Sequence, residues 1–474
     1  GLMPLILPGN VATATAAVGY DVANSCRFDD GSSACLNKSN GTPTSIKIFT
    51  ISCWVKRSTL GNTEALISFQ DTGDGDPRFR LGFIADQLWV DATNSATTAV
   101  VNLRTTQLFR DTSAWYHIVL RIDTTQATDT NRHRVYVNGT QVTSFSTATY
   151  LAQDEVLPVD FNEINIGTVD DNSRTNFFDG YLAEFVYCDG QTLAADQFGE
   201  FNSDSPTIWQ PIDVSGLTFG DNGFYLDFED SDNLGDDESS NADDFTENNI
   251  AATDQATDTP TNNFATMNSI DAIWPTTGTS SVFSEGNLQL VSGTGSNSST
   301  GYSYNNATFA LSTGKWYWEV KPTNTGAASH IGIISESQIY NQNLYDVVNS
   351  TAYQWSLRHD TGNIFNNGSN SAYSASYAAD DIVGVALDLT NSKLYFSKGG
   401  EWSDGSGSWD STTFDAAVGA VTITAAASTG NGHYFPTVGD SDHSNSSTWQ
   451  LNFGNPPYAN SSSVADGNGY GAFE

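Results

Sequence analysis

The 474-residue sequence predicts an all-β fold with two antiparallel β-sandwiches joined by an acidic bridge. Short apolar runs bounded by Gly, Asn, Asp, Ser and Thr dominate the chain, and this pattern is typical of many short strands. Helical periodicity is hard to find in any segment. The strand-rich segments fall into two blocks, each of a size that suits one sandwich, and a carboxylate-rich segment separates them.

The first block begins with a strand of clear two-residue periodicity. In Phe49–Val55 every second residue is apolar, which predicts one buried face. Asn138 and Gly139 separate two strand-like runs, and this pair predicts a tight hairpin because both turn residues need a positive φ. The remaining expected strands of this block are 115–122, 134–137, 141–145 and 178–186.

The second block starts near Val282. Its apolar cores are separated by turn residues such as Asn391 and Ser392, as expected for another antiparallel sandwich. Trp316 and Trp318 share one face of their strand, so we expect both to lie in the core. The expected strands are 287–291, 315–320, 330–334, 382–389, 393–396 and 449–453.

We predict four regions from these patterns. An N-terminal arm covers 1–18, the first sandwich 19–210, an acidic bridge 211–280 and the second sandwich 281–474. The bridge is predicted because its residues combine a dense run of carboxylates with little apolar content. The arm is predicted because the opening GLMPLILP is apolar, contains two prolines and lacks the basic region of a secretion signal.

The charge balance excludes several kinds of partner. The chain has 18 Lys and Arg against 55 Asp and Glu, so its formal charge is −37. Nucleic acids and anionic membrane surfaces attract proteins through Lys and Arg, so neither is an expected partner. No run of ~18 apolar residues predicts a membrane-spanning helix.

The cysteine count does not suit a disulfide-stabilised scaffold. The chain has four cysteines, at 26, 35, 53 and 188, and contains no C-x-x-C motif. We expect buried free thiols, because a free cysteine behaves as a small hydrophobic residue. Pairing of Cys26 with Cys35 stays open as an alternative.

Five segments of the first block together resemble a concanavalin A-like, laminin-G-type jelly roll. They follow the order of an opening strand, a Trp-containing strand, a V-N-G hairpin and a closing strand. The segments are SCRFDDGSSACL (25–36), FTISCWVKRS (49–58), SAWYHIVLRIDTTQ (113–126), RHRVYVNGTQVTSF (132–145) and FDGYLAEFVYCDGQTLAADQFGE (178–200).

The second block resembles a SPRY domain. The pattern D-x-[IV]-G-x-x-[LV]-D, a turn and then K-[LI]-x-F is the most specific part of the match. The segments are GKWYWEV (314–320), HIGI (330–333), DIVGVALDLTNSKLYFSKGGEW (381–402), HYFPTVGD (433–440) and WQLNFG (449–454). SPRY-like chains usually continue with a closing strand, so we expect either a sandwich truncated at its C-terminus, which we favour, or a last strand supplied by a neighbouring molecule.

The order of both blocks and the segment between them is similar to structural proteins of marine bacteriophages. This resemblance implies a virion-surface protein, a fibre or a capsid-decorating appendage, located on the extracellular particle. We expect the arm to bind other virion proteins, because its apolar residues Leu2, Met3, Leu5 and Leu7 have no local partner. Host-surface glycans are the expected ligands, and a homo-oligomer is the expected state.

Motifs for catalysis are missing from the sequence. There is no G-x-S-x-G elbow, the six histidines stand in no recognisable pattern, and metal motifs such as H-E-x-x-H do not occur. The E-x-D-x-x-E pattern of jelly-roll glucanases is also missing. We therefore expect no catalytic residues and no enzyme activity. A polysaccharide-degrading hydrolase stays the weaker alternative, beside a purely structural cement or bridging protein.

Calcium is the one cofactor that the sequence suggests. Asp71, Asp74 and Asp76 in the run DTGDGD supply the oxygen ligands that calcium prefers, although the EF-hand spacing fails. A solvated acidic loop without any metal is the alternative.

Glycan binding is the more specific functional hypothesis. Sugar sites combine aromatic faces with amide and carboxylate side chains on loops held by a rigid sheet. Loops with this mixture occur in the second block, and SPRY-like folds bind ligands through loops. The candidate binding residues are Tyr340, Asn343, Tyr345, Trp355, Asn363, Asn366, Trp402 and Trp409.

Overall fold

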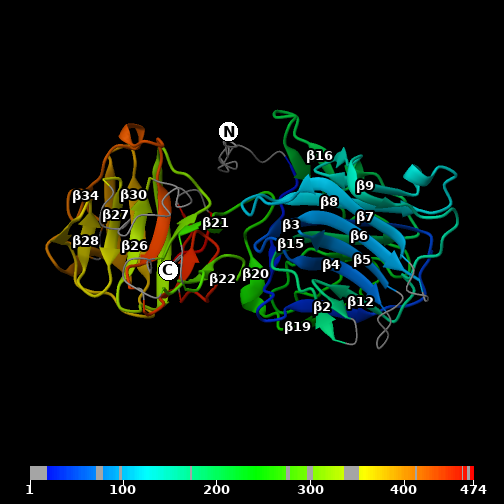
Figure 1. Ribbon diagram of the computed structural model, residues 1–474, viewed down its shortest axis with the longest axis horizontal. Helices are drawn as coiled ribbons and strands as arrows, with labels where there is room; N and C mark the ends of the chain where they lie inside the picture. The colour runs from blue at the N-terminus through cyan, green and yellow to red at the C-terminus, as the bar shows by residue number, and fades with distance from the viewer. Residues whose placement is uncertain are drawn as a thin grey trace. The chain divides into compact units, whose positions relative to one another are not determined.

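The computed structural model describes residues 19–70, 78–94, 99–170, 173–273, 278–295, 303–335, 352–411, 414–442, 444–461, 463–466 and 470–474. The described chain divides into two compact units, a first unit that ends at Asn263 and a second unit that starts at Phe264. Antiparallel sheets build both units, which confirms the all-β prediction (Figure 1).

Two eight-stranded sheets form the described part of the first unit. One sheet has the order β10 (Thr140–Gln141), β9 (His133–Val137), β8 (Tyr116–Asp123), β3 (Ile48–Arg57), β15 (Gly180–Asp189), β1 (Ser25–Phe28) and β20 (Gln255–Ala256), with β18 (Phe224–Leu226) also paired to β15. The other has the order β11 (Phe145–Thr149), β7 (Ala99–Leu108), β6 (Gln87–Thr93), β5 (Arg78–Ile84), β4 (Thr63–Gln70), β12 (Glu163–Ile166), β2 (Cys35–Ser39) and β19 (Thr246–Asn248).

Short elements complete this unit. Two small hairpins pair β13 (Val169–Asp170) with β14 (Arg174–Thr175) and β16 (Gly199–Phe201) with β17 (Trp209–Pro211). The 3-10 turns are η1 (Asp129–Asn131), η2 (Ala195–Gln197) and η3 (Ala252–Asp254).

The periodicity of β3 places one face in the core. Phe49, Ile51, Cys53 and Val55 all belong to the main hydrophobic cluster of the first unit, as predicted. The hairpin between β9 and β10 is also confirmed, because Asn138 and Gly139 have φ values of 47° and 73°. Both residues therefore adopt the left-handed conformation that this tight turn requires.

The predicted bridge 211–280 is wrong, because most of it belongs to the first sandwich. Its strands β18, β19 and β20 pair with β15, β2 and β1 respectively. Apolar residues spaced between the carboxylates enter the core of the unit, namely Phe224, Leu226, Phe228, Leu234 and Phe245. The segment is therefore ordered by edge-strand pairing and burial.

Three buried cations of the sandwich hold this acidic segment. Lys56 Nζ lies 2.7 Å from Asp258 Oδ2, and each side chain is 1% exposed. Arg27 pairs with Asp254 at 3.1 Å, and Lys38 pairs with Asp243 at 3.3 Å. Since each pair joins a strand of the sandwich to residues 243–258, charge complementarity fixes where the segment docks.

Backbone N–H groups hold a further carboxylate in the same segment. Asp237 is 3% exposed. Its Oδ1 accepts hydrogen bonds from the N–H groups of Tyr225 (2.9 Å) and Ser239 (3.0 Å), and its Oδ2 accepts one from the N–H of Asp243 (3.2 Å). The acidic run therefore forms a tightly bonded loop.

A seven-stranded and a nine-stranded sheet form the described part of the second unit. The first has the order β21 (Met267–Ile273), β24 (Ser303–Ala307), β35 (Phe435–Asp440), β26 (Ser329–Ile334), β27 (Gln354–Arg358), β28 (Asn363–Asn366) and β29 (Ser369–Ala372). The second has the order β22 (Val282–Ser284), β23 (Gln289–Val291), β36 (Thr448–Asn452), β25 (Lys315–Asn324), β30 (Val383–Asp388), β31 (Lys393–Lys398), β32 (Glu401–Ser403) and β33 (Trp409–Ser411), with β34 (Val421–Thr422) paired to β31. The turn η5 (Ala426–Ser428) lies beyond β34.

Tryptophans anchor the core of the second unit. Trp449 is fully buried, and its indole N–H donates to Ser329 Oγ at 2.9 Å, which links β36 to β26 of the opposite sheet. Trp318 is 2% exposed, which confirms its predicted burial. Trp316 is only half-buried and packs against the same cluster from its margin.

All four cysteines are buried free thiols, so Cys26 and Cys35 do not pair. Within the ranges given above, none of the helices has the length and apolar character needed to cross a membrane.

Asp258→Asn should lower the free energy of unfolding of the first unit by about 3–5 kcal/mol, because Lys56 would remain buried without its counter-charge. Urea unfolding measures this loss. The matched control is Asp154→Asn, which removes the exposed ion pair between Lys47 and Asp154 and should cost at most about 1 kcal/mol. Equal losses in the two variants would contradict the proposed role of the buried pair.

A carboxyl group at a bulge of β15 carries a second, pH-dependent contribution to stability. Glu184 interrupts the pairing of β15 with β3, has a φ of 48° and is 5% exposed. The hydroxyl of Tyr225 donates to its Oε2 at 2.9 Å. Burial raises the pKa of Glu184 to about 8, and the nearby charge of Asp227 adds to the rise.

A raised carboxyl pKa stabilises the fold at low pH, where the folded and unfolded states are both protonated at this site. That contribution is lost as the pH rises from about 4.3, the unfolded value, through about 8. Glu184→Gln keeps the acceptor for Tyr225 but cannot ionise. We therefore expect its unfolding free energy to match the wild type near pH 4 and to exceed it by roughly 3–5 kcal/mol at pH 9. Urea unfolding across this range provides the test, with the exposed Glu200→Gln as control, and parallel curves for wild type and Glu184→Gln would refute the expectation.

Candidate functional site

The outer face of the nine-stranded sheet in the second unit carries the candidate site. Trp318 and Val320 of β25 lie in the core, so Tyr317 and Glu319 point to the opposite face. Strand pairing places Glu319 opposite Gly384 of β30, Gly384 opposite Ser397 of β31, and Ser397 opposite Trp402 of β32. One row of side chains therefore crosses four neighbouring strands.

Four aromatic rings lie in sequence along this face, and we call them the aromatic row: Phe473, Tyr317, Trp402 and Phe414. Their ring centroids are 5.3 Å apart between Phe473 and Tyr317, 6.4 Å between Tyr317 and Trp402, and 4.8 Å between Trp402 and Phe414. Tyr317 is 37% exposed and Phe414 is 45% exposed. The row therefore presents ring surface to solvent although each ring is held by its neighbours.

A cavity of about 300 Å³ opens beside the aromatic row. Gly384 forms part of its lining, and a Cβ at this position would collide with the hydroxyl groups of Ser397 and Tyr317. Glycine is thus required for the cavity to exist with both hydroxyl groups in place. Tyr317, Glu319, Ile382, Ser397 and Glu474 line the rest, together with Gly399 and Gly400.

Hydrogen bonds fix the polar edge of this cavity. The Tyr317 hydroxyl donates to Glu319 Oε1 at 3.0 Å, Asn452 Nδ2 donates to Glu319 Oε2 at 2.8 Å, and the backbone N–H of Glu474 donates to Oε1 at 3.0 Å. Burial raises the pKa of Glu319. Burial and the Glu319 charge raise the pKa of Tyr317, so its hydroxyl stays protonated and keeps its orientation.

This arrangement suits the binding of a small polar ligand with one apolar face. The rings of the aromatic row offer stacking surface, and the hydroxyl of Ser397 offers a hydrogen-bonding group in the cavity. The cavity volume lies at the lower end of the range of ligand pockets, which is roughly 300–1,000 Å³.

The structure separates Trp402 from Trp409, which were both predicted to be binding residues on loops. Trp402 lies in the aromatic row on the outer face. Trp409 pairs with Ser403, packs against the core cluster, and directs its indole N–H to the carbonyl of Ser376 at 3.4 Å. Only Trp402 therefore belongs to the candidate site.

Trp355 was predicted in a binding loop, and that placement is wrong. It lies within β27, is 6% exposed and packs with its ring centroid 5.9 Å from that of Tyr434 in the core. The alternation along the strand turns its side chain inward, where burial of its apolar surface outweighs exposure on a loop.

Asn363 and Asn366 also lie on a strand, at the two ends of β28, and not on loops. Asn366 Nδ2 donates to the carbonyl of Gln354 at 2.7 Å, and Asn363 Nδ2 donates to Asn370 Oδ1 at 2.9 Å. Both side chains therefore link β28 to neighbouring strands of the seven-stranded sheet. The aromatic row lies on the other sheet, so neither asparagine belongs to the candidate site.

Six further candidate residues lie outside the described part of the chain. Tyr340, Asn343 and Tyr345 fall within 336–351, and Asp71, Asp74 and Asp76 fall within 71–77. The binding and calcium predictions for these residues remain predictions.

Sequence reasoning missed Tyr317, Ser397 and Phe414. The alternation in the run KWYWEV carried a usable signal, because it placed Tyr317 on the face opposite the two buried tryptophans. The neighbours of Tyr317 come from β30, β31 and β32, and only the strand order reveals them.

Two family models match this chain. Residues 29–196 match the family described as the concanavalin A-like lectin/glucanases superfamily, and residues 315–452 match the SPRY domain. No curated protein matches the sequence.

Similar solved structures include the SPRY domain of human HERC1, with 16% identity over 39% of this chain and 96% of that chain and a TM-score of 0.28. A SAP-like pentraxin from Limulus polyphemus shows 13% identity over 38% of this chain and 82% of that chain, with a TM-score of 0.29. A putative carbohydrate binding protein from Bacteroides ovatus shows 16% identity over 48% of this chain and 59% of that chain, with a TM-score of 0.33. The family matches and the strand topology together show that the chain carries a concanavalin A-like domain in its first unit and a SPRY domain in its second.

Proposed function

We propose that the protein is a non-enzymatic glycan-binding protein and that the aromatic row with its cavity is its carbohydrate-binding site. The observation that carries the proposal is the exposed aromatic row beside a cavity with polar groups at its edge. Carbohydrate rings have an apolar face of C–H groups and a rim of hydroxyl groups. An aromatic ring covers the first, while hydroxyl and carboxylate groups bond the second.

The charge of the chain favours a neutral glycan as the ligand. With a formal charge of −37, the protein repels anionic polymers at long range, although salt screens this repulsion beyond roughly 8 Å under physiological conditions. Affinity must then come from contacts within the site, that is, from ring stacking and hydrogen bonds.

Trp402→Ala should weaken glycan binding by about tenfold or more, since truncating a central aromatic anchor of a binding surface typically costs over about 1.4 kcal/mol. A glycan microarray identifies the best neutral oligosaccharide, and isothermal titration with that oligosaccharide compares the variant with the wild type.

The control for this experiment is Phe201→Ala, which removes a 48% exposed aromatic ring from the first unit. It should leave the affinity unchanged. Thermal unfolding of both variants separates loss of the site from loss of the fold. Unchanged affinity in a folded Trp402→Ala protein would refute the assignment of the site.

We further propose that this adhesion takes place on the surface of a bacteriophage particle, with residues 1–18 as the anchor to other virion proteins. The support is the resemblance of both sandwiches and the acidic segment to virion proteins of marine bacteriophages, together with the apolar opening GLMPLILP. A homo-oligomeric state forms part of the same proposal, because repeated copies raise the avidity of weak glycan contacts.

Deletion of residues 1–15 should abolish incorporation into particles while leaving both domains folded, as measured by immunoblotting of purified particles and by circular dichroism. Normal incorporation of the shortened chain would exclude the anchor. Sugar release from host polysaccharide would instead favour a hydrolase. Burial of the aromatic row against other virion proteins would favour a structural cement.

A further inference from the structure

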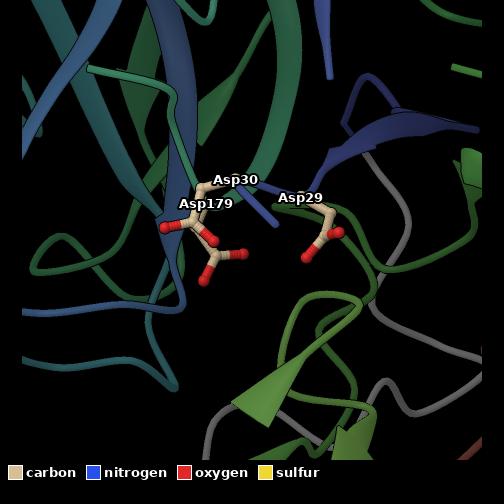
Figure 2. Close-up of side chains that lie close together, drawn as sticks. All are labelled: Asp29, Asp30 and Asp179. Atoms are coloured by element: carbon tan, nitrogen blue, oxygen red, sulfur yellow. The ribbon is translucent and has the colours of Figure 1, made fainter. Parts of the chain in front are cut away.

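Three aspartates of the first unit meet at one end of two paired strands. Asp29 and Asp30 directly follow β1, and Asp179 directly precedes β15. Since β1 and β15 are antiparallel and Phe28 lies opposite Gly180, the two segments meet at the same edge. One carboxylate oxygen from each residue lies within 4.8 Å of the other two. Figure 2 shows the three side chains close together.

Asp179 is the unusual member of this group. It is 1% exposed. Its Oδ2 accepts a hydrogen bond from the hydroxyl of Thr59, whereas its Oδ1 is buried and has no hydrogen-bond partner among the described residues. Burial and the charges of Asp30, Glu64 and Asp29 raise the pKa of Asp179 well above its usual range.

Two other buried carboxylates of the first unit have a cation beside them. Asp258 pairs with Lys56 at 2.7 Å, and Glu64 pairs with Arg57 at 2.9 Å. In the described ranges no Lys, Arg or His makes an ion pair with Asp179. An uncompensated buried charge is costly, and the two neighbouring carboxylates increase that cost.

The backbone holds these carboxylates in place from both sides. The N–H of Ser58 donates to the carbonyl of Asp179 at 3.0 Å. On the other segment, the N–H of Ser32 donates to Asp29 Oδ2 at 2.9 Å, and the N–H of Ala34 donates to the Asp29 carbonyl at 3.1 Å. Asp30 is exposed and Asp29 is half-buried, so this group of carboxylates borders solvent on one side.

We propose that Asp29, Asp30 and Asp179 bind a calcium ion. Three carboxylates supply hard oxygen ligands with three negative charges, and water on the exposed side can complete six to eight ligands. Calcium fits better than magnesium, which demands near-ideal octahedral geometry, because these carboxylates come from two separate segments. The site contains neither Cys nor His, so the softer ligands favoured by zinc do not contribute.

The bound ion supplies the positive charge that no described Lys, Arg or His places beside Asp179. It also links the turn after β1 to the start of β15, so binding stabilises the folded state over the unfolded state. This site lies in the first unit and is independent of the carbohydrate-binding site proposed for the second.

The test uses the full chain, freed of metal with EDTA and then dialysed. Isothermal titration with CaCl₂ should show a saturable site, and thermal unfolding should show a rise in Tm of several degrees with calcium. Magnesium at the same concentration should give a smaller rise. The calcium-induced shift should shrink as the pH is lowered, because protons compete for Asp179.

Two variants locate the ion. Asp179→Asn should remove calcium binding at this site and, without metal, should unfold at a higher temperature than the wild type, because an uncompensated buried charge is gone. Asp30→Asn changes an exposed residue, so it should fold normally while losing at least tenfold in calcium affinity. The matched control Asp204→Asn alters an exposed aspartate of the same unit and should bind calcium like the wild type.

The outcomes separate this proposal from the others. Wild-type calcium affinity in both Asp179→Asn and Asp30→Asn would overturn it and would shift attention to another site, such as Asp71, Asp74 and Asp76. A wild-type chain that does not bind calcium would overturn it as well. Trp402→Ala should retain calcium binding, so a failure of the glycan proposal leaves this one standing.

Discussion

The first sandwich depends on the pairing of scarce buried cations with a much larger number of carboxylates. The whole chain has only 18 Lys and Arg. Three of them form ion pairs with aspartates of a single acidic segment in this unit. Arg27, Lys38 and Lys56 come from strands β1, β2 and β3, and each meets an aspartate from residues 243–258. A buried cation without its partner is strongly destabilising, so these pairs select one docking position for the segment.

The same scarcity explains the other unusual carboxylates of this unit. Asp237 accepts hydrogen bonds from backbone N–H groups, and burial raises the pKa of Glu184 to about 8. Among the described residues, Asp179 has neither a paired cation nor a full set of hydrogen bonds. Backbone dipoles, a retained proton and a bound metal ion are the three ways in which a buried acid can be accommodated when basic side chains are few.

A different constraint applies in the second unit, where one face of the nine-stranded sheet packs in the core and the opposite face carries the candidate site. The inward residues of β25, β30 and β31 fill the core, among them Trp318, Val385 and Phe396. The outward residues at alternate positions, Tyr317, Gly384 and Ser397, form the wall and lining of the cavity. Each of these strands carries core and site residues in alternation, so the packed core holds the backbone of the site residues in a fixed position.

Local sequence patterns were enough to predict the all-β class, the two sandwiches, the buried face of Phe49–Val55 and the hairpin at Asn138 and Gly139. These features follow from local periodicity and turn chemistry, which a single segment contains. Tertiary structure alone decided where the acidic segment docks, that Trp355 is buried, that Trp402 and Trp409 face opposite sides, and that Asp29 and Asp30 meet Asp179. Each of these depends on strand order and on charge pairs between residues far apart in the chain, and a one-residue shift in register reverses the face of every side chain in a strand.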